Sequence, residues 1–231
     1  MALILNIETA TDVCSVSLAR DGELLNLRET KEAKSHASVL TVFIEEMLRE
    51  ASCSVNQLDA VAVSMGPGSY TGLRIGVSVA KGISYGASIP LIAVSTLQSL
   101  AQLALSRLSN ARTDFRLVPM IDARRMEVYT AIFDPRLNQL QETSALILAD
   151  DSFQRELQHR EWYFFGSGSE KSKSILNHPN ARFIDNLDAS AIGLIALAEE
   201  KYKKNNFENT AYFEPFYLKD FIATIPKKMF G

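Results

Sequence analysis

The residues with the clearest potential for chemistry lie in a glycine-rich stretch that follows the apolar run 60–63. That run predicts a buried strand, and Ser69 or Thr71 can cap a helix beginning directly after it. A glycine-rich turn before a helix directs backbone N–H groups at one point, an arrangement that suits an anion. The glycine spacing is one residue too long for the dinucleotide fingerprint, and no Gly-Lys-Ser/Thr follows as a phosphate loop requires. Two interpretations remain, an anion site or a tight turn that brings helix and strand close together, and both rest on Gly66, Gly68 and Gly72.

A second polar turn lies near the N-terminus, where Glu8 and Thr9 follow the apolar run 3–7. A carboxylate and a hydroxyl at the end of a strand can hold a hydrated metal–phosphate group, although an ordinary polar hairpin has the same composition. Together the two turns give a candidate nucleotide-binding set: Glu8, Thr9, Gly66, Gly68, Ser69, Thr71 and Gly72.

The helices that flank these turns carry more apolar surface than one sheet contact requires. In the helix predicted over residues 70–86, a spacing of about 100° per residue places Gly72, Gly76 and Ala80 on a side that fits against a sheet. The opposite side is also largely apolar, whereas a surface helix should be polar there. The helix predicted from Ser35 to Glu50 is similarly apolar beyond its core stripe. We expect these outer surfaces to lie under a second domain or, preferably, against a partner, through Val39, Val42, Phe43, Tyr70, Leu73, Arg74, Val77, Lys81 and Tyr85.

The composition is that of a globular protein with little bulk affinity for nucleic acid. The chain has 231 residues, 47% of them hydrophobic, and a formal net charge of −3. An acidic balance argues against binding nucleic acid through charge alone. Two cysteines, Cys14 and Cys53, form no metal-type cluster and favour a reducing compartment. With no apolar run of membrane-spanning length and no signal-like segment, we expect a soluble, cytoplasmic protein with no membrane partner.

A repeated pattern predicts two similar α/β halves. Strand, short acidic turn, alternating strand, turn and strand follow one another over residues 3–28, and the same order recurs over 117–148. The predicted units are residues 1–109, which carry the helices described above, and 114–231, with a linker around residues 110–114. Further helices are expected at 151–159, after the glycine turn 166–168, and at 189–204.

Several motifs, taken together, resemble the bacterial TsaB (YeaZ) family over nearly the whole chain. They are Ile4-Leu5-Asn6-Ile7-Glu8-Thr9-Ala10-Thr11, the block from Gly66 to Gly76, Gly82 to Gly86, Val94 to Leu97, Ile121-Asp122-Ala123-Arg124 with Glu127-Val128-Tyr129, and Pro215 to Lys219. The resemblance implies a duplicated actin-like, ribonuclease H-like α/β fold with mixed sheets. It also implies a role in making threonylcarbamoyl adenosine beside the tRNA anticodon. In that pathway the TsaB-like protein is the non-catalytic partner of its paralogue TsaD, which transfers the group, and TsaE supplies an ATPase. An older label for the family is glycoprotease-like, M22 peptidase.

The resemblance also allows a catalytic role to be tested on particular positions. TsaD-like relatives hold a metal with two histidines four residues apart, and the matching positions here are Thr96 and Leu100. The three histidines present, His36, His159 and His178, are scattered. We therefore expect no catalytic residues and no metal or cofactor of the chain's own.

What the resemblance implies is a heterodimer with a TsaD-like paralogue, with ATP or ADP at the partner interface and a TsaE-like ATPase and tRNA joined through the complex. The unpartnered surface predicts a homodimer when the partner is absent. The alternative functions are a stand-alone nucleotide-binding ATPase or phosphotransferase, which would use Glu8, Thr9 and the glycine turn, and an M22-type peptidase. A third alternative, a direct tRNA binder, is disfavoured by the acidic balance.

Overall fold

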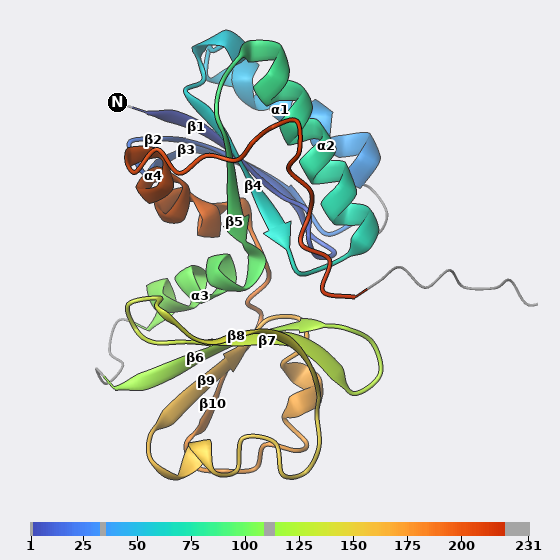
Figure 1. Ribbon diagram of the computed structural model, residues 1–231, viewed down its shortest axis with the longest axis vertical. Helices are drawn as coiled ribbons and strands as arrows, with labels where there is room; N and C mark the ends of the chain where they lie inside the picture. The colour runs from blue at the N-terminus through green and yellow to red at the C-terminus, as the bar shows by residue number, and fades with distance from the viewer. Residues whose placement is uncertain (1, 33–35, 109–113, 220–231) are drawn as a thin grey trace, which may run out of the picture.

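The computed structural model describes residues 2–32, 36–108 and 114–219 as two β-sheets, one above the other, each with helices or turns against it (Figure 1). Sheet A has the order β3-β2-β1-β4-β5. Its strands are β1 (Leu3–Glu8), β2 (Cys14–Arg20), β3 (Glu23–Thr30), β4 (Ala60–Gly66) and β5 (Leu91–Ser95). Sheet B has the order β10-β9-β6-β7-β8. Its strands are β6 (Phe115–Asp122), β7 (Glu127–Phe133), β8 (Gln139–Ile147), β9 (Glu161–Phe165) and β10 (Ala181–Ile184).

The two sheets have the same topology, which confirms the duplicated α/β fold predicted from the sequence. In sheet A the first three strands form an antiparallel meander, and β4 and β5 then add in parallel beside β1. In sheet B the meander β6-β7-β8 is antiparallel, and β9 and β10 add in parallel beside β6. Both sheets are therefore mixed, and the first strand of each in chain order, β1 or β6, lies at its centre.

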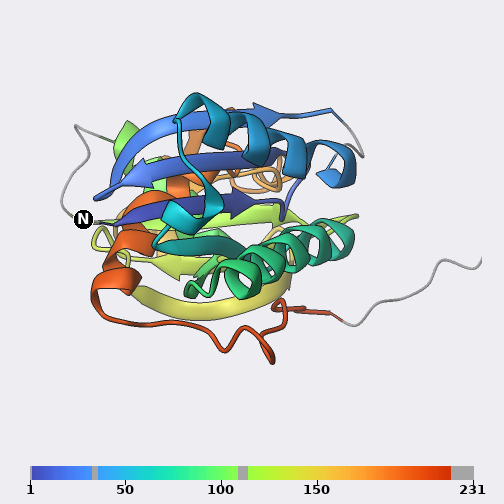
Figure 2. The same ribbon diagram turned by 90° about the horizontal axis from the view of Figure 1, so that it is seen from above.

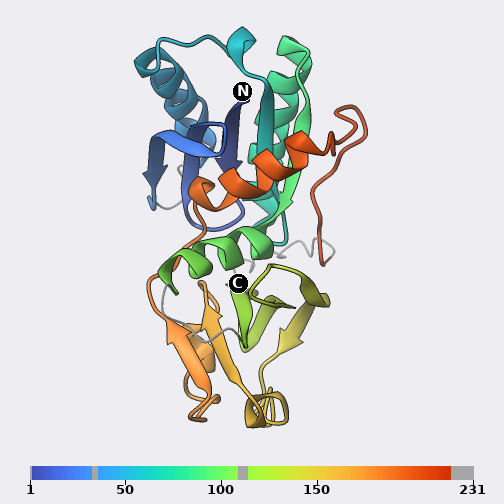
Figure 3. The ribbon, with the colours of Figure 1, turned by 90° about the vertical axis from the view of Figure 1, so that its left-hand side faces the viewer.

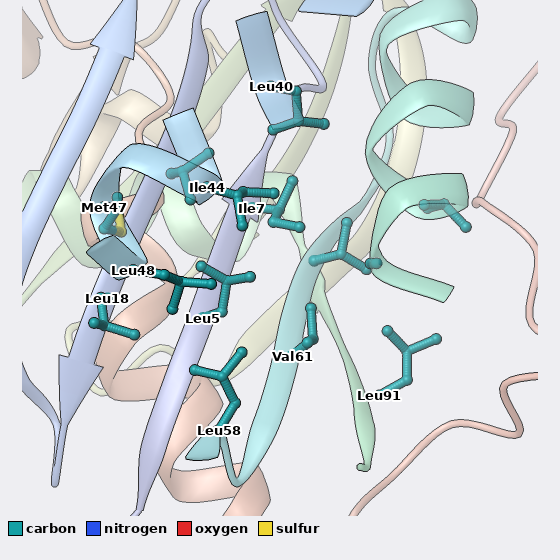
Figure 4. Close-up of a cluster of buried hydrophobic side chains, with 14 of the residues drawn as sticks. Leu5, Ile7, Leu18, Leu40, Ile44, Met47, Leu48, Leu58, Val61 and Leu91 are labelled. Carbon is teal, nitrogen blue, oxygen red and sulfur yellow. The ribbon is translucent and has the colours of Figure 1, made fainter. Parts of the chain in front are cut away.

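Helices α1 (His36–Glu50) and α2 (Tyr70–Ala87) lie side by side on one face of sheet A (Figure 2). The apolar stripe of α1 faces the strands, since Leu40, Ile44, Met47 and Leu48 are buried. Figure 4 shows these four side chains over Leu5 and Ile7 of β1, in a cluster that extends to Leu18, Leu58, Val61 and Leu91. The predicted core stripe of this helix is thus correct, except that Ala51 is exposed and Ser35, its predicted first residue, lies outside the described part of the chain.

The opposite face of sheet A is covered by the segment that follows sheet B. A 3₁₀ turn, η4 (Ala191–Leu194), leads into α4 (Ile195–Lys203), whose Leu197 and Ala198 pack with residues of β1, β4 and β5. Conversely, α3 (Thr96–Arg107), which follows sheet A, packs its Leu97, Leu100, Ala101 and Ala104 against sheet B. Figure 3 shows α4 across sheet A and α3 between the sheets. Residues 3–95 supply the strands of sheet A and residues 115–184 those of sheet B, while the segment from residue 191 onward packs on sheet A. Most of the predicted linker at 110–114 lies outside the described residues.

The second half lacks counterparts of α1 and α2 among its described residues. The predicted helix at 151–159 is only a turn with the short 3₁₀ segment η2 (Glu156–Gln158), and the glycine turn 166–168 leads only to η3 (Glu170–Ser172). Those two helix predictions were wrong. Sheet A alone therefore carries a pair of long helices on one face.

The C-terminal segment runs back along sheet A and α2. Glu208 N donates to Leu91 O of the edge strand β5, and Phe213 packs against the core under α2. Phe216 N then donates to Met65 O, and Lys219 forms an ion pair with Glu127 at the start of β7. The segment thus connects the two halves on the outside of the molecule (Figure 1).

Candidate functional site

The glycine-rich turn is filled by the chain's own backbone. A Cβ on Gly68 would lie 2.2 Å from Ala10 O, and one on Gly72 would lie 2.1 Å from Thr9 O. A Cβ on Gly66 would lie 2.6 Å from Phe216 O, at a backbone φ of +115° that disfavours other residues. The glycines are therefore explained by the close approach of the β1–β2 turn and the C-terminal segment.

Hydrogen bonds occupy the polar groups around the same turn. Ser69 N donates to Ala10 O at 2.7 Å, and Thr9 Oγ1 donates to Gly72 O at 2.8 Å. Ser69 Oγ caps α2 by accepting from Gly72 N. Of the two interpretations of this stretch, a tight junction between helix and strand is the one that these contacts support. Thr71 is exposed in the first turn of α2 and takes no part in them.

Glu8 lies fully buried beneath this junction. Its Oε1 accepts from Ala10 N at 2.7 Å, while Oε2 has no hydrogen-bond partner among the described residues. Burial raises the pKa of Glu8 to about 7, against the lowering effect of the Ala10 N–H. Glu8 and Thr9 therefore lie together with the glycine turn, and neither side chain is exposed to solvent.

The matching positions for a metal-binding histidine pair are also part of the core. Thr96 shares a hydrogen bond with Ser64 at 2.8 Å, and Leu100 packs in the cluster between α3 and sheet B. Within the described ranges, no group of three or more His, Cys, Asp or Glu side chains is placed to hold a metal ion. None of the described helices is long and apolar enough to cross a membrane.

The face that α2 presents outward differs from the one predicted. Leu73 and Val77, expected at a partner interface, are only 1% and 3% exposed and belong to the protein's own core. The buried face is rotated by roughly 60° from the predicted one, at about 100° per residue. The prediction failed because α2 carries glycine and apolar residues most of the way round, so the larger side chains, which gain most from burial, decided the orientation.

Tyr70 and Lys81, two further predicted partner residues, are used by the C-terminal segment. Lys81 Nζ donates to Ala211 O and Phe213 O at 3.2 and 2.9 Å. The Tyr70 ring packs on Tyr217, with ring centroids 4.7 Å apart. This edge of α2 is therefore already partly covered, while Arg74 and Tyr85 are exposed beside it.

A largely apolar and uncovered surface is formed by α1 together with the edge of α2 that the C-terminal segment does not contact. Val42 is 46% exposed, and Val39 and Phe43 are half-buried, as are Ile75, Val79 and Ile83 of α2. Gly82 and Gly86 lie on the same side, with nothing within 4 Å of an added Cβ. We call this surface the α1–α2 face; it consists of Val39, Val42 and Phe43 with Ile75, Ser78, Val79, Gly82, Ile83 and Gly86.

The two classes of glycine in α2 should respond oppositely to the same substitution. Gly72→Ala is expected to lower the free energy of unfolding by about 2 kcal/mol or more, because the methyl group collides with the Thr9 carbonyl. Gly82→Ala, the matched control, should leave it unchanged or raise it by up to about 1 kcal/mol through helix propensity. Urea unfolding measures both, and a Gly72→Ala variant as stable as the wild type would mean that the turn has room for a ligand.

Burial of Glu8 predicts a pH-dependent stability. Because its pKa is raised in the folded state, its protonated form stabilises the fold below about pH 4.5, and this contribution is lost as the pH rises toward about 7. Glu8→Gln should therefore match the wild type at pH 4 and exceed it at pH 8, by roughly 3 kcal/mol at most. Urea unfolding at both pH values measures this, with Glu23→Gln at an exposed carboxylate as control. A Glu8→Gln variant that is weaker at pH 8 would show that the ionised carboxylate is needed.

Comparison with known proteins places the chain in a family. Residues 30–227 match the family model described as TsaD, tRNA N6-adenosine threonylcarbamoyltransferase. The chain is 31% identical to the tRNA threonylcarbamoyladenosine biosynthesis protein TsaB of Escherichia coli, over 95% of this chain and 96% of that protein. It is 29% identical to the TsaB protein of Haemophilus influenzae, with 94% and 93% covered.

A solved structure superposes on nearly the whole of this chain. The crystal structure of a Pseudomonas aeruginosa protein described as similar to peptidase YeaZ superposes with a TM-score of 0.83 at 26% identity, covering 95% of this chain and all of that one. The duplicated topology, the shared sequence and this superposition agree with the actin-like α/β fold that the motifs implied. The chain belongs to the TsaB (YeaZ) family, within the wider TsaD family.

Proposed function

We propose that this chain is a non-catalytic partner subunit for threonylcarbamoyl transfer to the adenosine beside the anticodon of tRNA. It would bind a TsaD-like transferase paralogue and complete or position the active site of that subunit. Membership of the TsaB family supports the pathway, since the relatives are named for tRNA threonylcarbamoyladenosine biosynthesis.

The α1–α2 face is the observation that carries this proposal. Gly82 and Gly86 are exposed, and each costs a helix about 1 kcal/mol relative to alanine, yet no packing among the described residues uses their lack of a side chain. A helix from another protein can approach the backbone closely at such positions. The half-buried residues beside them, Ile75, Val79 and Ile83, would gain apolar contacts from the same helix.

A paralogue with an equivalent helix pair is the partner that suits this geometry. Two long helices from each subunit would cover each other's apolar surface, and only the first half of this chain has such a pair among its described residues. The same surface is self-complementary in kind, which supports a homodimer when the paralogue is absent.

The interior of the glycine turn supports a role without independent catalysis. Glu8 is buried, the turn is filled by Thr9 and Ala10, and the positions of the histidine pair hold Thr96 and Leu100. Any ATP or ADP would then bind at the junction with the partner, and a TsaE-like ATPase and tRNA would join through the complex. We place the assembly in the cytoplasm, where tRNA is modified. No specific contact favours the alternatives, a stand-alone ATPase or phosphotransferase or an M22-type peptidase.

A bulky side chain on the α1–α2 face should block assembly without harming the fold. We expect Gly82→Leu to weaken binding to the transferase paralogue at least tenfold, because the side chain holds the partner helix away, while the melting temperature is unchanged or raised. Glu200→Leu, at an exposed position of α4, is the control and should bind normally. Titration calorimetry with the purified paralogue measures the affinity.

The same samples test function. Transfer of the threonylcarbamoyl group to tRNA by the paralogue should require this chain and should fall in parallel with the affinity of Gly82→Leu. Full transfer with this chain omitted would contradict the proposal, and so would wild-type affinity in a folded Gly82→Leu protein.

A further inference from the structure

The junction of the two halves carries a strip of basic and aromatic side chains, exposed except for the half-buried Tyr70, that the α1–α2 face does not include. The strip begins at the first turn of α2, continues along the end of the C-terminal segment and finishes at the β6–β7 hairpin; Figure 1 shows the segment reaching this junction. We call it the junction strip, and it consists of Tyr70, Arg74, Tyr217, Lys219, Arg124 and Arg125.

Direct contacts join its parts across both halves. The Arg74 guanidinium lies 5.5 Å from the centre of the Tyr70 ring, and that ring packs on Tyr217. Two residues further along, Lys219 forms an ion pair with Glu127, which begins β7. Adjacent on the hairpin are Arg124 and Arg125, both exposed. Any ligand long enough to follow the strip would contact both sheets' units.

The side chain of Lys171 holds the β6–β7 hairpin in place through three hydrogen bonds. Lys171 Nζ donates to Asp122 Oδ1 at 2.9 Å, to Arg125 O at 2.8 Å and to Glu127 O at 2.6 Å. The carboxylate of Asp122 is thus paired with Lys171, and that of Glu127 is paired with Lys219. Over the described ranges, the guanidinium groups of the remaining cations form no ion pair with a carboxylate; these are Arg74, Arg124 and Arg125.

The two arginines at the tip of the β6–β7 hairpin have left-handed backbone conformations. The φ angles of Arg124 and Arg125 are +70° and +48°, in the left-handed region that glycine and asparagine adopt at lower cost. Such strain tends to persist where a side chain has a functional task. The turn between β6 and β7 accounts for this backbone shape, with Arg124 N donating to Asp122 Oδ1 and Glu127 N donating to Arg124 O, but it does not require an arginine side chain at either position.

From this arrangement we infer that the junction strip binds the phosphodiester backbone of RNA, with bases stacking on its exposed rings. Unpaired guanidinium groups suit phosphate oxygens, and Tyr217 and Phe216, which are 37% and 38% exposed, offer faces on which unpaired bases stack. Neighbouring Glu214 and the chain's net charge of −3 make this contact weak in the isolated chain. The inference rests on the proposed function, which brings tRNA to the complex.

A substitution that relieves the strain separates RNA binding from folding. In the complex with the transferase paralogue, Arg124→Asn with Arg125→Gly should lower the affinity for unmodified tRNA about tenfold or more and reduce the salt dependence of binding by about one to two ion equivalents. Because asparagine and glycine fit the positive φ angles, the melting temperature should not fall. Arg136→Asn, on the exposed turn at the other end of β7, is the control and should change neither property.

Fluorescence anisotropy of labelled tRNA at two salt concentrations, with calorimetry of the heterodimer, gives the readouts. Unchanged tRNA affinity in a double variant that still forms the heterodimer overturns the inference. Weakened heterodimer or ATPase binding with unchanged tRNA affinity also overturns it, and would identify a protein-binding surface. If the wild-type chain does not bind the paralogue, the proposed function fails. The strip is then tested on the chain alone at low salt, where a loss of tRNA affinity in the double variant supports it and no loss overturns it.

Discussion

The contact between the β1–β2 turn and the start of α2 determines how the rest of sheet A is arranged. Thr9 and Ala10 approach the helix so closely that no side chain fits at Gly68, Gly72 or Gly76. This contact buries Glu8 and fixes the position of α2 against the sheet. The glycines from which the sequence predicts an anion site are thus the ones that the β1–β2 turn approaches, and the carbonyl groups of Thr9 and Ala10 occupy the space of their missing side chains.

Once α2 is fixed in this way, its two edges have different neighbours. One edge receives the C-terminal segment, which takes the hydrogen-bonding capacity of Lys81 and one face of Tyr70. The other edge lies beside α1 and keeps exposed glycines and half-buried apolar side chains. The duplicated second half has only 3₁₀ turns in the corresponding places among its described residues. The asymmetry between two halves of equal topology thus gives the molecule a single helical face of this kind.

The sequence predicted the strands and their repetition well because alternation and buried runs are local patterns, as in Leu3–Glu8 and its counterpart Phe115–Asp122. The sequence predicted the existence of α2 but not which of its sides is buried. Apolar and glycine residues occur most of the way round this helix, and the side that carries Leu73 and Val77 is the one that packs in the core. It also could not show that α3 and α4 exchange sheets, or that Phe216 and Lys219 return to Gly66 and Glu127, because these contacts join residues far apart in the chain. The helices predicted after β8 and β9 are absent from these segments, where the structure has short 3₁₀ turns, because short polar segments form isolated turns as readily as helices.

Hydrogen–deuterium exchange on this chain, with and without the purified transferase paralogue, tests whether α1 and α2 form the partner interface. Binding is expected to slow exchange in α1 and along the exposed edge of α2, residues 75–86, while sheet B and α4 exchange as in the free chain. Slowed exchange in sheet B or α4, with α1 and α2 unchanged, would contradict it.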